Sequence, residues 1–264
     1  MKVNYQDLIR YGVEIYTKAG VPEEDARLLM EELVGSNLAG VDSHGVLRIQ
    51  EYLNQMESGS IVAGAPVTIE KETPSIAIVN GNLNFGQVAA RKMVDIVAEK
   101  AQKVGIACAV SIHTNHVGRL GSYTEKLAEK GLLAYGSVGA YTIGPMAPWG
   151  AKEPKLGTNP ISMAVPRGEG KPPIFLDCAT TVVAEGKLRT YVQRGKQVPE
   201  GWIRDNQGRD TTDPLQFYQN PKGSILPMGG NTCGAKGSGL AIMANMFGVA
   251  LGNDTTLDCT LFSE

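Results

Sequence analysis

The sequence predicts an α/β fold in which an N-terminal helical region precedes a sheet layer covered by helices. Over residues 4–58, apolar residues recur at helical spacing between helix-start and helix-stop signals. From about residue 75, short apolar runs of strand length alternate with amphipathic helical segments. With 264 residues, the chain can bury a substantial core as one large domain or as two smaller ones.

Three helices are predicted in the N-terminal region. The first covers Tyr5–Lys18. The second starts at Pro22, where three acidic residues complement the positive end of a helix, and it stops near Gly40, a C-cap residue. The third helix follows directly and carries the most informative stretch of the chain, which begins at Asp42.

That stretch reads Asp-Ser-His-Gly-Val at positions 42–46, and Arg48 and Tyr52 follow it. Because residues four apart lie on one face of a helix, we expect His44, Arg48 and Tyr52 to form one polar stripe, with Asp42 or Ser43 capping the helix start. A guanidinium can hold a carboxylate at two points while an imidazole transfers a proton, so the stripe suits a small carboxylate substrate. The core-facing stripe of the same helix comprises Val46, Ile49, Leu53 and Met56.

The second region alternates strands and helices. Asn80-Gly81 is a turn signal after the first strand. A glycine- and proline-rich stretch, residues 144–160, is too apolar for a flexible linker and is interpreted as an ordered loop over a site. Residues 195–235 are predicted to be mostly loop. Strands are predicted at 75–79, 106–112, 132–138, 161–165 and 174–177, and helices at 87–104, 120–130 and 238–251.

Charge and cysteine usage limit the class of protein. The 25 basic and 27 acidic residues give a formal net charge of −2, without the basic patch that binding to nucleic acid or a membrane surface requires. No apolar run approaches the roughly 20 residues that span a bilayer, and the first residues lack the apolar segment of a signal peptide. The four cysteines form no C-x-x-C pair, which favours reduced thiols and a cytoplasmic location.

A second group of chemically active residues follows the strand predicted at 106–112. His113, Asn115 and His116 come directly after it, and Gly118 and Gly121 are close by. Ligands of α/β proteins gather at the carboxyl ends of strands, which favours both histidines. His116 is the stronger candidate because the glycines after it let a ligand approach the backbone, whereas His113 is equally explained as the end of the strand.

Three further motifs each have a functional and a structural interpretation. Asp177, with Ala-Thr-Thr at 179–181, either holds a ribose or nicotinamide amide or caps a following helix. Gly-Thr-Asn-Pro at 157–160 either lines a substrate pocket or turns the chain. Residues 234–239, including Lys236, either bind a phosphate at the start of the last helix or simply pack it against the sheet. No G-x-G-x-x-G follows a strand, and residues 229–236 depart from the P-loop pattern.

Taken as an ordered set, these motifs resemble the second type of malate/L-lactate dehydrogenase family. That family also includes ureidoglycolate, sulfolactate and 2,3-diketogulonate oxidoreductases and Δ1-piperideine-2-carboxylate reductases. Each motif alone is weak, whereas their order and spacing over nearly the whole chain are specific. The matching residues are Asp42–Val46 with Arg48 and Tyr52, Asn115-His116 with Gly118 and Gly121, Gly157–Pro160, Phe175–Asp177 with Ala179–Thr181, Gly186-Lys187, and Lys236–Leu240.

The resemblance implies a non-Rossmann NAD(P)-binding domain, built on a mixed sheet covered by helices, which accounts for the missing fingerprint. It places an N-terminal helical region with the His44/Arg48 substrate stripe at residues 1–72 and the NAD(P)-binding α/β domain at 73–264. It also implies a homodimer with sites near the subunit interface. Family members continue beyond the last helix, so we expect the C-terminal part of the family to be missing after Glu264, and a catalytically impaired, truncated homologue is an alternative.

The same resemblance implies roles for individual residues. His116 exchanges a proton with the substrate hydroxyl, and His44 is also catalytic. Arg48 binds the substrate carboxylate, and Ser43, Tyr52 and Thr158 complete the predicted substrate contacts. Contacts to NAD or NADP are expected from Phe175, Leu176, Asp177, Cys178, Ala179, Thr180, Thr181, Ala235 and Lys236.

The leading hypothesis is therefore an NAD(P)-dependent oxidoreductase that transfers a hydride between nicotinamide and a small 2-hydroxy or 2-keto acid of the malate or lactate kind. A cyclic imino acid reductase is a close variant, because the same carboxylate clamp and proton donor serve it. A metal-dependent hydrolase is a remote alternative, in which His113 and His116 are joined by His44 and by Asp42 or Asp177. The sequence leaves the substrate, and the choice between NAD and NADP, open.

Overall fold

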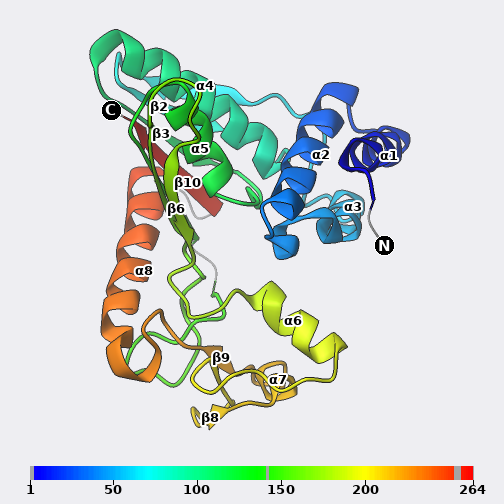
Figure 1. The fold of residues 1–264 in the computed structure, drawn as a ribbon, viewed down its shortest axis with the longest axis vertical. Coiled ribbons are helices and arrows are strands. Elements are labelled where there is room, and N and C mark those ends of the chain that lie inside the picture. The colour runs from blue at the N-terminus through cyan, green and yellow to red at the C-terminus, as the bar shows by residue number, and fades with distance from the viewer. Residues whose placement is uncertain (1–2, 141–142, 253–256, 264) are drawn as a thin grey trace. The chain divides into compact units, whose positions relative to one another are not determined.

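The computed structural model describes residues 3–140, 143–252 and 257–263, and it confirms the mixed α/β fold (Figure 1). None of the described helices is both long and apolar enough to cross a membrane. The helices are α1 (Tyr5–Lys18), α2 (Glu23–Leu38), the 3-10 helices η1 (Asp42–His44) and η2 (Val46–Arg48), α3 (Ile49–Glu57), α4 (Gly86–Val104), α5 (Gly121–Glu129), α6 (Glu185–Gln193), α7 (Pro214–Phe217) and α8 (Gly230–Gly252). The strands are β1 (Thr68–Glu72), β2 (Ile76–Asn80), β3 (Ala107–Ile112), β4 (Ala134–Ala140), β5 (Ile161–Val165), β6 (Ile174–Cys178), β7 (Ile203–Arg204), β8 (Asp210–Thr211), β9 (Ser224–Ile225) and β10 (Leu257–Ser263).

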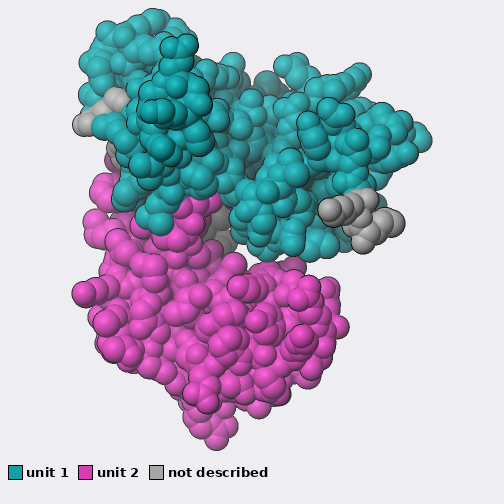
Figure 2. All heavy atoms as spheres, viewed as in Figure 1, with its two compact units in different colours: residues 1–136, 162–176, 257–264 teal, residues 137–161, 177–256 magenta. Residues whose placement is uncertain are grey.

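The chain divides into two compact units (Figure 2). Unit 1 contains residues 1–136, 162–176 and 257–264, and unit 2 contains residues 137–161 and 177–256. The boundaries fall inside β4, β5 and β6, because each of these strands contributes residues to both units. The division at residues 72 and 73 that the sequence suggests stays a prediction.

The larger sheet is mixed, as predicted, with the strand order β1-β2-β3-β10-β4-β5-β6. β2 and β3 run parallel, with Asn80 opposite Ile112, whereas β1 and β10 pair antiparallel with β2 and β3 respectively. The loops that leave β2 and β3 therefore start at the same edge of the sheet. They remain bonded to each other beyond the strands, since Gly81 N donates to Ile112 O at 2.9 Å and Leu83 N donates to His113 O at 2.9 Å.

The core of unit 1 lies where the N-terminal helices pack together and against the residues before α4. It contains the fully buried aromatic side chains Tyr16, Tyr52 and Phe85. Phe85 packs edge-to-face on both tyrosine rings, with centroid distances of 5.8 Å and 6.1 Å. The predicted apolar stripe is confirmed as a set of partly buried side chains against this core: Val46, Ile49, Leu53 and Met56.

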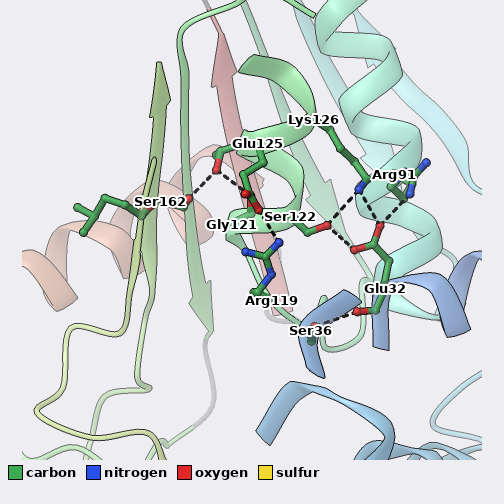
Figure 3. Close-up of polar contacts among 11 residues, drawn as sticks. Glu32, Ser36, Arg91, Arg119, Gly121, Ser122, Glu125, Lys126 and Ser162 are labelled. Atoms are coloured by element: carbon green, nitrogen blue, oxygen red, sulfur yellow. Dashed lines mark hydrogen bonds and ion pairs between the residues drawn. The ribbon is translucent and has the colours of Figure 1, made fainter. Parts of the chain in front are cut away.

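A buried carboxylate joins three helices of unit 1 (Figure 3). Glu32 on α2 is only 8% exposed, and its carboxylate lies 2.8 Å from Arg91 Nη1 on α4 and 3.5 Å from Lys126 Nζ on α5. Ser122 Oγ, at the start of α5, donates to the same group. Because a buried charge is tolerated only when it is paired and hydrogen-bonded, this bridge fixes α2 relative to α4 and α5.

The single helix predicted to carry His44, Arg48 and Tyr52 on one stripe is wrong. Gly45 has an extended backbone, with φ −91° and ψ −155°, and it separates η1 from η2. The cause is Asn37 on α2, whose Oδ1 accepts from Val46 N at 2.9 Å and whose Nδ2 donates to Asp42 Oδ1 at 2.6 Å. A Cβ at position 45 would lie 2.2 Å from Asn37 Oδ1, so this approach requires glycine.

Two smaller predictions about helix starts are also wrong. Neither Asp42 nor Ser43 caps a helix, because the N-cap residues are Val41, Gly45 and Arg48 and none forms a side-chain cap bond. The last helix starts at Gly230 rather than near residue 238, and its backbone is kinked at Cys233. Residues 234–239 therefore lie inside α8, just after the kink.

Unit 2 has structure where the sequence suggested mostly loop. Residues 195–235 contain α7 and the small antiparallel sheet β8-β7-β9. This sheet and α6 surround a separate hydrophobic cluster of Val183, Leu188, Val198, Ile203, Phe217 and Ile225. Its strands have two residues each, too short for a periodic pattern to reveal. The exposed strand β1 was missed for a related reason, since none of its five residues is buried.

Candidate active site

His116 lies on the loop between β3 and α5 in unit 1, and two neighbours hold this loop. Asn115 Nδ2 donates to the backbone oxygens of Leu83 at 2.8 Å and of Asn84 at 3.1 Å. Gly86, the first residue of α4, packs directly on the loop: a Cβ there would lie 2.1 Å from Asn115 O and 2.4 Å from His116 O. The start of α4 and the histidine loop are therefore locked together by backbone contact.

The ring of His116 is bonded through its Nδ1. Tyr52 Oη, on α3, lies 2.7 Å from this nitrogen, and Gln87 Nε2, on α4, donates to the same hydroxyl at 2.9 Å. Both Tyr52 and Gln87 are 1% exposed, so the two bonds form in the core. The sequence predicted Tyr52 as a substrate contact, whereas the structure directs its hydroxyl to His116.

His44 and His116 face each other. Their rings stack at a centroid distance of 5.4 Å and an interplanar angle of 21°. Ser43 Oγ lies 3.0 Å from His44 Nδ1. Neither Nε2 has a hydrogen-bond partner among the residues that the structure describes, so each ring offers one nitrogen to a ligand. Two residues that are far apart in the sequence are thus brought into one site.

Arg48 completes this group. Its Nε donates to Ser43 O at 2.8 Å, and its Nη1 donates to both carboxylate oxygens of Glu51 at 2.9 Å and 2.8 Å. These bonds hold the half-buried guanidinium next to the histidines, whose pKa values its charge lowers. Nη2 makes no hydrogen bond within the described part of the chain, which leaves an N–H edge for a carboxylate.

The environment of the two imidazoles favours their neutral forms. Burial, followed by the charges of Arg48 and Arg119, lowers the pKa of His44 to about 4. Burial, followed by Arg48 and His44, places the pKa of His116 well below its usual value of 6.5. Burial raises the pKa of Tyr52 to about 12, so its hydroxyl keeps its proton. At pH 7 the site therefore holds two neutral rings next to a permanent cation.

Arg119 is a charged neighbour to which the sequence assigned no role. It follows His116 by three positions, and its Nη2 is paired with Glu125 (Figure 3). Its guanidinium lies 5.8 Å from the centre of the Phe175 ring, and its charge acts on His44. Its position three residues after His116, in the His-Val-Gly-Arg stretch, was the sequence feature that could have pointed to Arg119.

Three of the predicted segments, around Thr158, Thr180 and Lys236, are adjacent within unit 2. Thr180 N donates to Thr158 O at 2.9 Å, and Met228 N donates to Thr180 O at 2.8 Å. Met228 in turn contacts α8, since a Cβ on Gly237 would lie 2.2 Å from Met228 O. The segment after β6, the Thr158 loop and the residues around Lys236 are therefore connected by direct backbone contacts.

The side chains in these segments differ in exposure. Phe175 and Leu176 are 43% and 47% exposed, and Ala235 and Lys236 are exposed as well. Asp177, Cys178 and Ala179 are half-buried. The Thr180 and Thr181 hydroxyls are buried and donate to the backbone oxygens of Thr158, Asn159 and Val183. Asp177 does not cap the next helix, because α6 starts at Glu185 with Ala184 as its N-cap.

The structure does not gather the residues of the metal-site alternative into one site within the described chain. His113 is turned toward β2, with Nδ1 3.2 Å from Asn80 Oδ1. No group of three or more His, Cys, Asp or Glu side chains gathers as a metal site among the residues described. What the geometry does assemble is a proton-transfer site next to a fixed cation, in a protein of mixed α/β architecture.

Comparison with known proteins gives the family. The family model for malate/L-lactate dehydrogenase matches residues 3–262, so the chain belongs to that family, as the sequence motifs predicted. Malate dehydrogenase of Pyrococcus abyssi is 36% identical over 258 residues, covering 97% of this chain and 70% of the relative. The (2R)-3-sulfolactate dehydrogenase (NADP(+)) of Chromohalobacter salexigens is 35% identical over 234 residues, covering 88% of this chain and 66% of the relative.

Solved structures agree with this assignment. Malate dehydrogenase from Pyrococcus horikoshii superposes with a TM-score of 0.87 at 31% identity, over 100% of this chain and 75% of that one. The Δ1-piperideine-2-carboxylate reductase from Pseudomonas syringae pv. tomato gives 0.88 at 28% identity, over 99% of this chain and 81% of that one.

Proposed function

We propose that this protein is an NAD(P)-dependent oxidoreductase that interconverts a small 2-hydroxy acid and the corresponding 2-keto acid. The observation that carries the proposal is the His44–His116 pair next to Arg48, held by Tyr52. The family membership supports the same class of reaction.

Each residue has a role in this proposal. Arg48 binds the substrate carboxylate through its Nη2 edge, which fixes the orientation of the neighbouring carbinol carbon. In the oxidation direction, Nε2 of His116 accepts the hydroxyl proton, and in the reduction direction it returns that proton to the carbonyl oxygen. A bound nicotinamide supplies the hydride acceptor or donor. His44 supplies the second imidazole of the site, and Ser43, whose Oγ lies 3.0 Å from its Nδ1, orients the ring.

Substrate binding also changes the acid–base properties of the site. The free site keeps both rings neutral because burial and Arg48 disfavour a further positive charge. A substrate carboxylate on Arg48 compensates this charge and raises the pKa of the neighbouring imidazole. The keto acid and the proton therefore bind together in the reduction direction.

The cofactor residues remain proposals as well. Lys236 is exposed and forms no ion pair with the described residues, so it can bind a phosphate, whereas the exposed Phe175 and Leu176 offer an apolar face to a ring. The Asp177 carboxylate suits ribose hydroxyls. These donor types fit a dinucleotide.

The substrate class is tested with the purified protein, NADH or NADPH, and a panel of oxaloacetate, pyruvate, sulfopyruvate and a cyclic imino acid. The relatives include malate and sulfolactate dehydrogenases and a Δ1-piperideine-2-carboxylate reductase, so the panel contains a substrate for each. We expect turnover with at least one keto acid. Turnover of the imino acid alone would replace the proposal with the reductase alternative.

The role of His116 is tested by His116→Asn. We expect kcat to fall by about 10²–10⁴-fold while NAD(P)H binding, followed by nicotinamide fluorescence, is retained. His113→Asn is the matched control, because His113 belongs to the same loop but bonds toward Asn80. Equal rates for both variants would remove His116 from the mechanism.

Two further expectations stand beside this proposal. A homodimer is expected from the family resemblance, and light scattering on the purified protein measures it. A cytoplasmic location is supported by Cys108, Cys178 and Cys233, which are all free thiols.

A further inference from the structure

The hydrogen bonds of the Tyr52 hydroxyl depend on which ring nitrogen of His116 carries the proton. This hydroxyl lies between His116 Nδ1, at 2.7 Å, and the side-chain amide of Gln87, at 2.9 Å. The hydroxyl carries a single proton, and it bonds to no other described residue. Its proton can therefore go to only one of the two neighbours, and the other neighbour has to donate to the oxygen.

Two arrangements satisfy these bonds. In the first, the Gln87 amide N–H donates to Tyr52 Oη, Tyr52 donates to His116 Nδ1, and the proton of the neutral ring is on Nε2. In the second, His116 Nδ1–H donates to Tyr52 Oη, Tyr52 donates to the Gln87 amide oxygen, and Nε2 is unprotonated. They differ by a half-turn of the Gln87 amide, whose oxygen and nitrogen ends have the same shape.

The far end of that amide does not decide between them. In the orientation described, Gln87 Oε1 is buried and has no hydrogen-bond partner among the described residues. Gly118, with φ +79°, packs against the nitrogen end of the same amide, since a Cβ there would lie 3.1 Å from Gln87 Nε2. In the orientation described, no hydrogen bond from a described residue therefore holds Oε1 in place.

The chemistry selects the second arrangement. A base that removes the substrate hydroxyl proton needs a free Nε2, which requires the ring proton on Nδ1. After it has accepted the substrate proton, the imidazolium still carries a proton on Nδ1. Nδ1 is thus a donor to Tyr52 in both states of the reaction, and Tyr52 must donate onward to an acceptor.

We propose that Gln87, acting through the Tyr52 hydroxyl, holds the ring proton of His116 on Nδ1 and so keeps Nε2 available as the base. Gln87 and Tyr52 are positioning residues in this scheme, since neither contacts the reacting atoms. The proposal rests on the proposed role of His116 in the reaction. The high pKa of Tyr52 supports it, because a phenol that keeps its proton can pass on a hydrogen bond without ionising.

The tautomer of His116 is measured directly by ¹⁵N NMR on histidine-labelled protein at about pH 7.5, without substrate or cofactor. The chain has three histidines, so the His44→Gln and His113→Asn variants assign the spectrum. We expect a protonated Nδ1 and an unprotonated Nε2 on His116. A protonated Nε2 in the wild-type protein would overturn the proposal without any variant of Gln87.

Variants then test the two residues separately. In Gln87→Met the amide acceptor is gone, so Tyr52 turns to donate to Nδ1, and we expect the ring proton to move to Nε2. We expect Tyr52→Phe to release the proton from Nδ1 in the same way. Gln50→Met, on the exposed face of α3, is the matched control and should leave the tautomer unchanged. An unchanged tautomer in Gln87→Met would remove Gln87 from the scheme.

Kinetics distinguish this inference from the proposed function. With a substrate that turns over, Gln87→Met should lower kcat for alcohol oxidation by about 10²–10⁴-fold and leave KM for the hydroxy acid near the wild-type value. If the wild-type protein shows the Nδ1–H tautomer but oxidises no hydroxy acid, the proposed function fails and the proton arrangement stands. If the wild-type protein oxidises a hydroxy acid while Nε2 of His116 is protonated, the proposed function stands and the proton arrangement fails.

Discussion

Two imidazoles that stay neutral at pH 7 affect the stability of the protein. In an unfolded chain a histidine titrates near 6.5, whereas His44 in the folded protein titrates at about 4 and His116 well below 6.5. At pH values between the folded and unfolded pKa, the histidines are protonated in the unfolded chain but neutral in the folded protein. The free energy of unfolding therefore decreases as the pH falls through this range.

The pH dependence gives the first prediction at this scale. As the pH falls below about 6.5, each histidine should reduce the free energy of unfolding with a slope that approaches about 1.4 kcal/mol per pH unit. Urea denaturation at a series of pH values measures the slope. His44→Gln should make it shallower, since one of the two groups no longer titrates. A slope identical to that of the wild-type protein would contradict the burial of His44 as a neutral ring.

The influence of Arg119 on His44 gives a second prediction. Removing its charge in the double variant Arg119→Met/Glu125→Gln should raise the pKa of His44 above about 4, because one of the two nearby cations is gone. The second substitution is included because an unpaired Glu125 would itself raise that pKa. NMR titration of the three histidines follows the change, and Arg10→Met, on the exposed face of α1, is the control. No shift would show that Arg119 does not act on His44.

Among the helices, the start of α4 has the strictest geometric requirement. Gly86→Ala places a methyl group where the backbone oxygens of Asn115 and His116 lie, so the loop or the helix has to move. We expect a loss of about 1–3 kcal/mol in stability and a lower kcat, since His116 moves away from Tyr52. Thermal unfolding and steady-state kinetics on the same preparation measure both.

The matched control for this variant is Gly35→Ala, in the interior of α2. A Cβ at position 35 meets nothing within 4 Å, so this variant should be neutral or up to about 1 kcal/mol more stable. A similar loss of stability in both variants would point to a general effect of the substitution rather than to the contact with the histidine loop.

The sequence predicts correctly those elements that their own residues define, and it fails where a residue from another element shapes the backbone. α1 has the predicted bounds and α4 begins one residue early, because their own apolar periodicity and end signals define them. The third helix fails because Asn37, on the preceding helix, bonds to Asp42 and Val46, and a pattern of spacing contains no such contact. The motifs singled out His44, Arg48 and His116, which the structure brings together, and their roles stay predictions. Gln87 was hidden, since a glutamine in an amphipathic helix gives no chemical signal.

On the scale of the whole molecule, the Glu32 bridge connects the N-terminal helices to the helices that follow the sheet strands. Its carboxylate contacts groups on α4 and α5, while α2 itself carries the Asn37 contacts that shape the His44 segment. The position of His44 on η1 therefore depends on α2, which carries both the Asn37 contacts and the buried charge of Glu32. Glu32, Arg91 and Lys126 all belong to unit 1, so the bridge concerns that unit alone. Each unit has its own hydrophobic cluster.

Glu32→Gln tests the bridge. Losing the charge leaves Arg91 and Lys126 without their shared partner, and we expect the free energy of unfolding to fall by about 2–3 kcal/mol. Chemical denaturation measures the loss. Glu31→Gln, the exposed neighbour on the same helix, should change stability by less than about 0.5 kcal/mol. Equal effects from the two variants would mean that the bridge adds nothing beyond a surface charge.

Tyr52 belongs to two systems at once: its ring fills the aromatic core with Phe85, and its oxygen touches His116. Selection for tighter packing and selection for faster turnover consequently act on one side chain. Laboratory evolution toward heat resistance should leave this position unchanged even where surrounding core residues are exchanged freely. A lineage that does replace it would have to find another way to orient the imidazole before it could recover its rate.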